Sequence, residues 1–160
     1  MDTVDTRPRI YFYSSRKPYF EFTNFSRHPI TIDGVVWPTT EHYFQAAKFN
    51  DAELKETVRL AKAPAIAAKM GRDRAYTSKM RSDWDKYRLE AMMDALRAKF
   101  TQHKELTQLL LDTGDAELFE DSPKDYFWGA GADRTGNNQL GILLMDLRSE
   151  LREKEENGEN

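Results

Sequence analysis

One short segment of the sequence carries an acid, an amide and an amine at helical spacing. Glu41, Gln45 and Lys48 stand at positions i, i+4 and i+7, so all three share one narrow face if residues 40–49 form a helix. A carboxylate, an amide and an ammonium group in such a row could act on a polar substrate. They could equally form a solvated helix face, because charges at i and i+7 are too far apart to interact. On spacing alone, the solvated face is the favoured interpretation.

Aromatic side chains indicate a second candidate region. Residues 19–25 (YFEFTNF) hold four aromatic rings without a helical or strict strand period. This pattern is typical of a loop folded over something flat, and it fits a loop that plugs the core equally well. Trp84 stands at the head of an expected long helix, where a tryptophan usually packs in the core. It could also stack on a nucleobase-like ring.

A glycine-rich stretch near the C-terminus is the third candidate. Four of the eight glycines fall within residues 129–141, directly after DYFW (125–128) and before a leucine-rich segment. Such a loop before a helix lets backbone N–H groups approach a phosphate. The dinucleotide-binding spacing GxGxxG is absent, so the signal on its own is weak.

The remaining pattern indicates an α+β chain, mainly helical, with a small antiparallel sheet. Alternating apolar residues around Asp33-Gly34 predict a hairpin over residues 30–37. Strands are also expected at 10–13 and 116–120, and helices at 40–49, 51–61, 64–70, 82–100, 106–111 and 140–151. We expect a single domain over residues 10–151, a flexible tail over 1–9 and a charged tail over 152–160.

Composition and charge exclude several classes of protein. The 160-residue chain has a formal net charge of −3 and no cysteine. It therefore has no overall positive field to hold nucleic acid and can form neither disulfides nor thiolate metal sites. The three histidines lack metal-ligand spacing, so we expect no metal and no cofactor. With no apolar run near the roughly 20 residues of a membrane span and no signal peptide, we expect a soluble, cytoplasmic protein.

Taken together, these segments resemble the NADAR family, in particular its YbiA-like members, from Ile10 to about Leu151. The motifs that carry the resemblance are IYFYS, PYFEFTNFS, IDGVVWPTTEHYFQAAKF, MGRDR, SDW, ALRAKF, LLLDTG, DYFWGAG and GNNQLGILLMDLR. The resemblance implies a compact, mainly helical α+β domain that hydrolyses N-glycosidic bonds to ribose. It also implies two substrate classes: early phosphoribosyl-aminopyrimidine intermediates of riboflavin synthesis, and ADP-ribose attached to guanine in nucleic acid.

The resemblance also implies which residues form the site and reverses the interpretation of residues 40–49. Glu41 is the first candidate for the catalytic carboxylate and Asp125 the second, with Lys48 in the site as well. Whether Lys48 forms a Schiff base with an opened ribose stays open. Relatives often have a lysine shortly after the equivalent of Trp84; here Arg88 occupies the nearest place, with Lys86 two residues earlier. If that cation is catalytic in relatives, its role does not carry over, because arginine cannot supply a neutral amine. The expected substrate-binding residues are Asn24, Phe25, Gln45, Trp84, Trp128, Gly129, Asn137 and Asn138.

The function predicted from the sequence is therefore an N-glycosidase acting on riboflavin-pathway intermediates and releasing ribose 5-phosphate. The alternatives are a hydrolase that removes ADP-ribose from guanine and a module that binds ADP-ribose or NAD without cleaving it. The expected partner is a small phosphoribosyl or ADP-ribosyl molecule, with nucleic acid only as an ADP-ribosylated substrate and no membrane. The oligomeric state cannot be inferred from the sequence.

Overall fold

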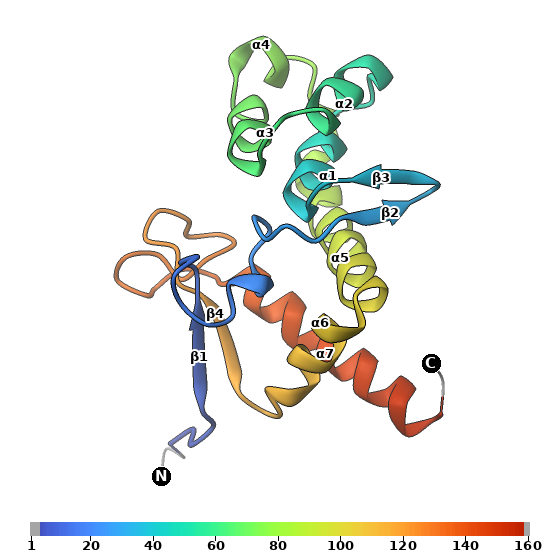
Figure 1. Ribbon diagram of the computed structural model, residues 1–160. Helices are drawn as coiled ribbons and strands as arrows, with labels where there is room; N and C mark the ends of the chain where they lie inside the picture. Colours follow the sequence, from blue (N-terminus) through green and yellow to red (C-terminus); the bar gives the residue numbers. More distant parts are fainter. Residues whose placement is uncertain (1–3, 159–160) are drawn as a thin grey trace. The chain divides into compact units, whose positions relative to one another are not determined.

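The computed structural model describes residues 4–158, and the chain forms two compact units. The central unit is Asn24–Lys104, and the terminal unit joins Met1–Thr23 to Glu105–Asn160. Figure 1 shows the elements of each unit. The α+β class and the predominance of helix are confirmed, whereas the expectation of a single domain over residues 10–151 stays a prediction.

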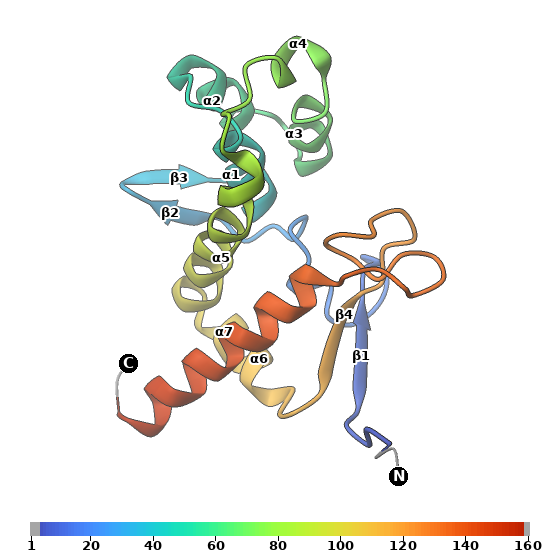
Figure 2. The same ribbon diagram turned by 180° about the vertical axis from the view of Figure 1, so that it is seen from behind.

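The central unit consists of a β-hairpin and a group of helices around α1. Asp33 and Gly34 form the hairpin turn with positive φ values of 52° and 79°, as a two-residue turn of this kind requires. Helix α1 packs against α2, α3 and α5, and these helices lie together in both views (Figures 1 and 2). The elements are β2 (Ile30–Ile32), β3 (Val35–Trp37), α1 (Thr40–Ala47), α2 (Ala52–Arg59), α3 (Pro64–Met70), α4 (Arg74–Thr77) and α5 (Trp84–Gln102).

Local hydrogen bonds fix where α1 begins. Thr39 is the N-cap residue, and its side chain accepts a hydrogen bond from the backbone N–H of His42. The His42 ring is fully buried and lies 2.8 Å from Thr39 Oγ1 and 3.0 Å from the carbonyl oxygen of Ala61. His42 therefore ties the start of α1 to the segment that follows α2.

The core of the central unit lies beneath α1, where the side chains of Phe49, Val58 and Ala67 are fully buried. Along α5, Met92, Leu96 and Phe100 are buried as their helical spacing predicts. Leu89, one turn before Met92 and Met93 on α5, is 39% exposed.

The terminal unit is built on a parallel pair of strands with α7 packed across β4. The sequence does not predict this pairing. Parallel strands are joined by a long connection instead of a short turn, so no local signal shows that β1 and β4 are partners. The antiparallel pairing that the sequence does predict is confirmed in the β2–β3 hairpin. The elements are β1 (Arg9–Phe12), the 3₁₀ helix η1 (Phe20–Phe22), α6 (Lys104–Asp112), β4 (Glu117–Glu120) and α7 (Gln139–Glu156).

Regular secondary structure extends into both expected tails. Arg9 already belongs to β1, and Arg7 pairs with Asp5 at 2.6 Å and with Glu117 at 2.7 Å. Helix α7 continues past Leu151 to Glu156, because nothing in its charged last turns breaks a helix. Residues 1–3 and 159–160 of these tails lie outside the described residues.

No helix within residues 4–158 is both long enough and apolar enough to cross a membrane.

Candidate active site

The predicted row of polar side chains on α1 is buried. Glu41 is only 8% exposed and Gln45 only 6% exposed. The Gln45 amide donates a hydrogen bond from Nε2 to Glu41 Oε1 at 2.7 Å. The Glu41 carboxylate is therefore held in one orientation and largely shielded from water. The interpretation of this face as solvated is therefore wrong, because α3 and α5 pack around α1.

Lys48 is the C-cap residue of α1 and is half-buried beside that row. Its Nζ lies 3.3 Å from the carbonyl oxygen of Gly71 and 5.9 Å from the ring centroid of Phe44. Burial lowers the pKa of Lys48, the Glu41 carboxylate raises it, and the Arg72 guanidinium lowers it further. The net lowering increases the fraction of Lys48 that is uncharged at a given pH.

Gly71 is a residue of this site that the sequence reasoning missed. A Cβ atom added to it would lie 1.7 Å from Gln45 Oε1 and 3.2 Å from Lys48 Nζ. Gly71 has an ordinary helical φ of −65°, so glycine is needed here for space and not for backbone conformation. The available signal is the MGRDR segment, one of the motifs that carry the family resemblance.

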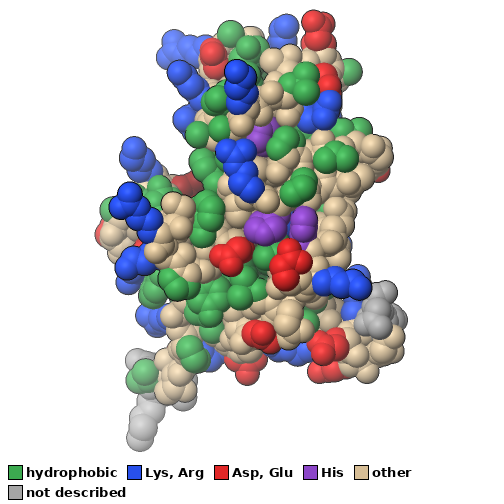
Figure 3. All heavy atoms as spheres, viewed as in Figure 1, with side chains coloured by type: hydrophobic (Ala, Val, Ile, Leu, Met, Phe, Trp, Pro, Cys, Tyr) green, Lys and Arg blue, Asp and Glu red, His purple; other side chains and the backbone are tan. Residues whose placement is uncertain are grey.

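The Lys and Arg residues within 69–81 (KMGRDRAYTSKMR) form a cationic stretch that is largely a surface feature. Lys and Arg side chains gather over α3 and α4 in Figure 3, and Arg81 pairs with Asp83 at 2.6 Å. Arg72 is exposed yet acts on the pKa of Lys48. Among the cations of this stretch, Arg72 is therefore the one whose charge acts on Lys48.

Trp84 and Phe25 are the two aromatic residues of the central unit that the sequence offers as stacking groups. Trp84 is 8% exposed, and its ring packs at 5.1 Å from that of Phe44, the residue that Lys48 also approaches. Trp84 therefore has a clear packing role, and its stacking on a base stays a prediction. Phe25 is 39% exposed, so part of its ring is accessible to a ligand.

Asn24 connects the aromatic-rich loop to the start of α1. Its carbonyl oxygen accepts a hydrogen bond from the backbone N–H of Glu41 at 3.2 Å. Its side-chain Oδ1 accepts one from Thr40 Oγ1 at 2.8 Å. The loop that carries Asn24 and Phe25 is thus fixed directly to the residue that bears the candidate carboxylate.

In the terminal unit, Asp125 organises the turn that it begins. Its Oδ1 accepts hydrogen bonds from the backbone N–H groups of Phe127 at 3.0 Å and of Trp128 at 2.7 Å. The Trp128 ring contacts that of Phe127 edge to face at 4.8 Å. Asp125 therefore has a structural role whether or not it contacts a substrate.

The glycine-rich loop is packed tightly on its own backbone. A Cβ atom on Gly129 would lie 2.8 Å from the carbonyl oxygen of Asp125. The buried Asn138 accepts from the N–H of Glu120 at 3.0 Å and donates to the carbonyl of Leu118 at 2.8 Å, which fastens the loop to β4. Asn137 is exposed. Close packing explains Gly129 and Asn138 without a phosphate, so their contact with substrate stays a prediction.

Within residues 4–158, no group of three or more histidine and acidic side chains could hold a metal ion.

Comparison with known proteins agrees with the resemblance seen in the motifs. Residues 11–152 match the NADAR domain, so the chain belongs to the NADAR family. N-glycosidase YbiA of Escherichia coli K12 is 48% identical over 142 residues, which cover 89% of this chain and 88% of that protein. The NMR structure of E. coli YbiA matches with a TM-score of 0.86 at 46% identity, covering 95% of this chain and 89% of the other.

Two further relatives widen the range of organisms. N-glycosidase Npun_R5314 of Nostoc punctiforme is 44% identical, with 89% of this chain and 92% of that protein covered. The chloroplastic riboflavin biosynthesis protein PYRR of Zea mays is 39% identical, and the match covers 89% of this chain but 25% of that longer protein.

Proposed function

We propose that this chain is a hydrolase of N-glycosyl compounds that cleaves the bond between ribose C1 and an aminopyrimidine nitrogen in riboflavin-pathway intermediates. Water is consumed, and the products are the free aminopyrimidine and ribose 5-phosphate. The observation that carries the proposal is the buried Glu41 carboxylate, held by Gln45 in the same helix face as Lys48. The names of the relatives, N-glycosidase and riboflavin biosynthesis protein, support the reaction and the substrate class.

Glu41 supplies the negative charge that this reaction needs. Cleavage of a C–N bond at ribose C1 develops positive charge on the sugar, and a nearby carboxylate stabilises it. The same carboxylate can take a proton from the attacking water. The Gln45 amide fixes the orientation of Glu41 through the 2.7 Å hydrogen bond, so little reorganisation is required when the charge develops.

Lys48 supplies an amine whose lowered pKa keeps part of it uncharged. In one route, the neutral amine attacks C1 of the opened ribose and displaces the aminopyrimidine, which leaves a Schiff base between Lys48 and the sugar. Water then hydrolyses the Schiff base and restores the amine, so the overall reaction still consumes one water. In the other route, Lys48 acts only as a hydrogen-bond donor. Borohydride added during turnover traps a Schiff base as a stable mass adduct on Lys48 and thereby separates the two routes.

Substrate contacts are proposed for further residues. In the central unit, the partly exposed Phe25 is available to stack on the pyrimidine, and Asn24 and Gln45 offer amides for its edge or the ribose hydroxyls. The assignments that rest on the family resemblance alone are those of Trp84 and of the terminal-unit residues Asp125, Trp128, Gly129, Asn137 and Asn138. A cytoplasmic location also stays a prediction from sequence.

The test is release of product measured by mass spectrometry. The wild-type chain is incubated with 5-amino-6-(5-phosphoribosylamino)uracil, and the expected products are 5,6-diaminouracil and ribose 5-phosphate. ADP-ribosylated guanosine is tested in parallel. Cleavage of the second compound alone would replace the proposed substrate class, and binding without cleavage of either would favour a module that only recognises ADP-ribose or NAD.

A further inference from the structure

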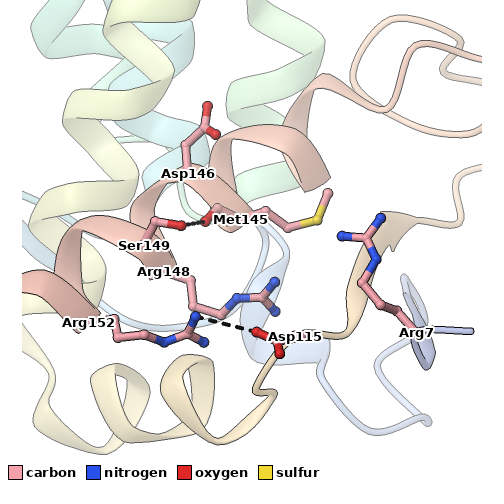
Figure 4. Close-up of a pocket in the computed structure, with 7 residues that line it drawn as sticks. All are labelled: Arg7, Asp115, Met145, Asp146, Arg148, Ser149 and Arg152. Atoms are coloured by element: carbon pink, nitrogen blue, oxygen red, sulfur yellow. Dashed lines mark hydrogen bonds and ion pairs between the residues drawn. The ribbon is translucent and has the colours of Figure 1, made fainter. Parts of the chain in front are cut away.

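The terminal unit contains a cavity that includes none of the residues assigned to the reaction. Its volume is about 330 Å³. Figure 4 shows that the head groups of three arginines project toward it, with that of Arg148 between those of Arg7 and Arg152. The lining consists of Arg7, Asp115, Met145, Asp146, Arg148, Ser149 and Arg152.

Arg148 is the unusual member of this lining. The residue is only 6% exposed. Its Nη1 donates to Thr113 Oγ1 and to the carbonyl oxygen of Ala116, both at 2.8 Å. A guanidinium carries five N–H donors in a planar fork. Among the described residues, the Nε and Nη2 groups of Arg148 have no hydrogen-bond partner. The edge of the guanidinium formed by Nε and Nη2 therefore makes no hydrogen bond, although Arg148 lines the cavity.

The carboxylates of the cavity are engaged elsewhere or too far away to pair with Arg148. Asp115 lies 3.4 Å from Arg152, and Arg7 pairs with Asp5 and Glu117. Within residues 4–158, Arg148 has no ion-pair partner.

The surroundings of Arg148 disfavour its positive charge. Burial lowers the pKa of Arg148, and the charges of Arg152 and Arg7 lower it further, while Asp115 raises it. Arginine nevertheless stays charged in proteins. A buried charge without a counter-ion is costly, so an anion in the cavity would be stabilised.

We propose that this cavity binds a single oxyanion, the phosphate or carboxylate group of a small molecule, on the free edge of the Arg148 guanidinium. That edge matches the geometry of two oxygens on one phosphorus or carbon atom. Arg7 and Arg152 add positive charge at the walls of the cavity. Asp115 and Asp146 would repel an extended polyanion, which favours a compact ligand over nucleic acid.

The experiment is a ¹H–¹⁵N NMR titration of the full chain with inorganic phosphate and, separately, with malonate. Sodium chloride keeps the ionic strength constant. We expect saturable shifts of the backbone amides of residues 113–116 and 145–152 and of the Arg148 Nε–H signal with at least one of the two probes. Signals of residues 41–48 and 71–72 are followed separately, so that binding at the candidate active site is not mistaken for binding here.

Arg148→Lys provides the decisive comparison, because lysine keeps the charge and can still donate to Thr113 and Ala116 but loses the fork. The expected result is binding about tenfold weaker than in the wild type. Arg97→Lys, the same change at a partly exposed position of α5, should bind as the wild type does. Shifts that never saturate with either probe, or equal affinity in Arg148→Lys, would overturn the proposal. Neither result would bear on the proposed N-glycosidase reaction.

Discussion

The α-carbon of Gly71 packs against the side-chain amide of Gln45, so that a methyl group at position 71 would lie 1.7 Å from Gln45 Oε1. This contact joins the end of α3 to the polar face of α1. Gln45 in turn holds Glu41, and the carbonyl oxygen of Gly71 accepts a hydrogen bond from Lys48. Gly71 thereby influences the positions of all three polar groups without having a reactive side chain.

Gly71→Ala tests this contact. The added methyl group must displace Gln45, and overpacking of this kind costs about 1–3 kcal/mol of folding free energy. Turnover should also fall, because a displaced Gln45 no longer orients Glu41. Denaturant unfolding measures the first effect, and product release measures the second.

The matched control is Gly71→Ala in a Gln45→Ala background. Removal of the Gln45 side chain makes room for the methyl group, so the second substitution should then cost much less stability than it does alone. Equal costs in the two backgrounds would show that the Gly71–Gln45 contact is not the cause.

Arg72→Gln should raise the pKa of Lys48. The Arg72 guanidinium is one of the two causes that lower this pKa, so its removal favours the ammonium form. NMR titration of the lysine side-chain signals measures the change directly. Arg74→Gln, at an exposed position of α4, serves as the control and should leave the pKa unchanged. An unchanged or lower pKa in Arg72→Gln would contradict the assigned role.

If the neutral amine of Lys48 is the reactive form, the same substitution moves the pH–rate profile. A raised pKa means that more of Lys48 is protonated at a given pH, so the rising limb should shift to higher pH in Arg72→Gln. A limb at the same pH, despite a measured rise of the Lys48 pKa, would indicate that another group controls it.

His42 should make the protein less stable as the pH falls. Burial lowers the pKa of His42 below its ordinary value of 6.5, so the unfolded chain takes up a proton before the folded chain does. Stability is therefore complete above that ordinary value and decreases as the pH falls through it. Denaturant unfolding at about pH 7.5 and about pH 5.5 should show a smaller loss in His42→Gln than in the wild type. Both proteins keep His28 and His103, so an equal loss would assign the effect to other groups.

Two substitutions of Asp125 separate its role as a hydrogen-bond acceptor from the role of its negative charge. Asparagine keeps an oxygen that can accept the backbone N–H groups of Phe127 and Trp128, whereas alanine does not. We expect Asp125→Ala to lose about 1 kcal/mol of stability through the broken turn, and Asp125→Asn to lose less. Asp125→Asn should also retain far more turnover than Glu41→Gln does. The reverse order of activity would make Asp125 the catalytic carboxylate.

The sequence predicts those structural features that are determined by residues close together in the chain. The Asp33-Gly34 turn follows from neighbouring residues and is confirmed. The capping of α1 by Thr39 is equally local in its cause. The burial of Glu41 could not be inferred from spacing, because it arises from α3 and α5, which pack onto α1 from distant parts of the chain. The need for glycine at position 71 has the same origin.

The parallel pairing of β1 with β4 was missed for a related reason. No turn signal next to either strand indicates which strand it pairs with. The segment between β1 and β4 includes the whole central unit. The motif resemblance indicated the α1 row as functional when spacing alone favoured a solvated face. The resemblance also assigns Asp125 and Asn138 to the site, and both side chains already make structural hydrogen bonds. For Asp125, the two substitutions above separate the structural role from a catalytic one.

The most direct test of the account is turnover by Glu41→Gln on the phosphoribosylaminouracil substrate. Glutamine keeps the size of the side chain and an oxygen for the Gln45 amide, but it removes the negative charge. The account predicts a loss of about a hundredfold or more in turnover with the fold intact, while Glu53→Gln on the exposed face of α2 stays at the wild-type rate. Turnover by Glu41→Gln within a few-fold of the wild type would contradict the central role of this carboxylate.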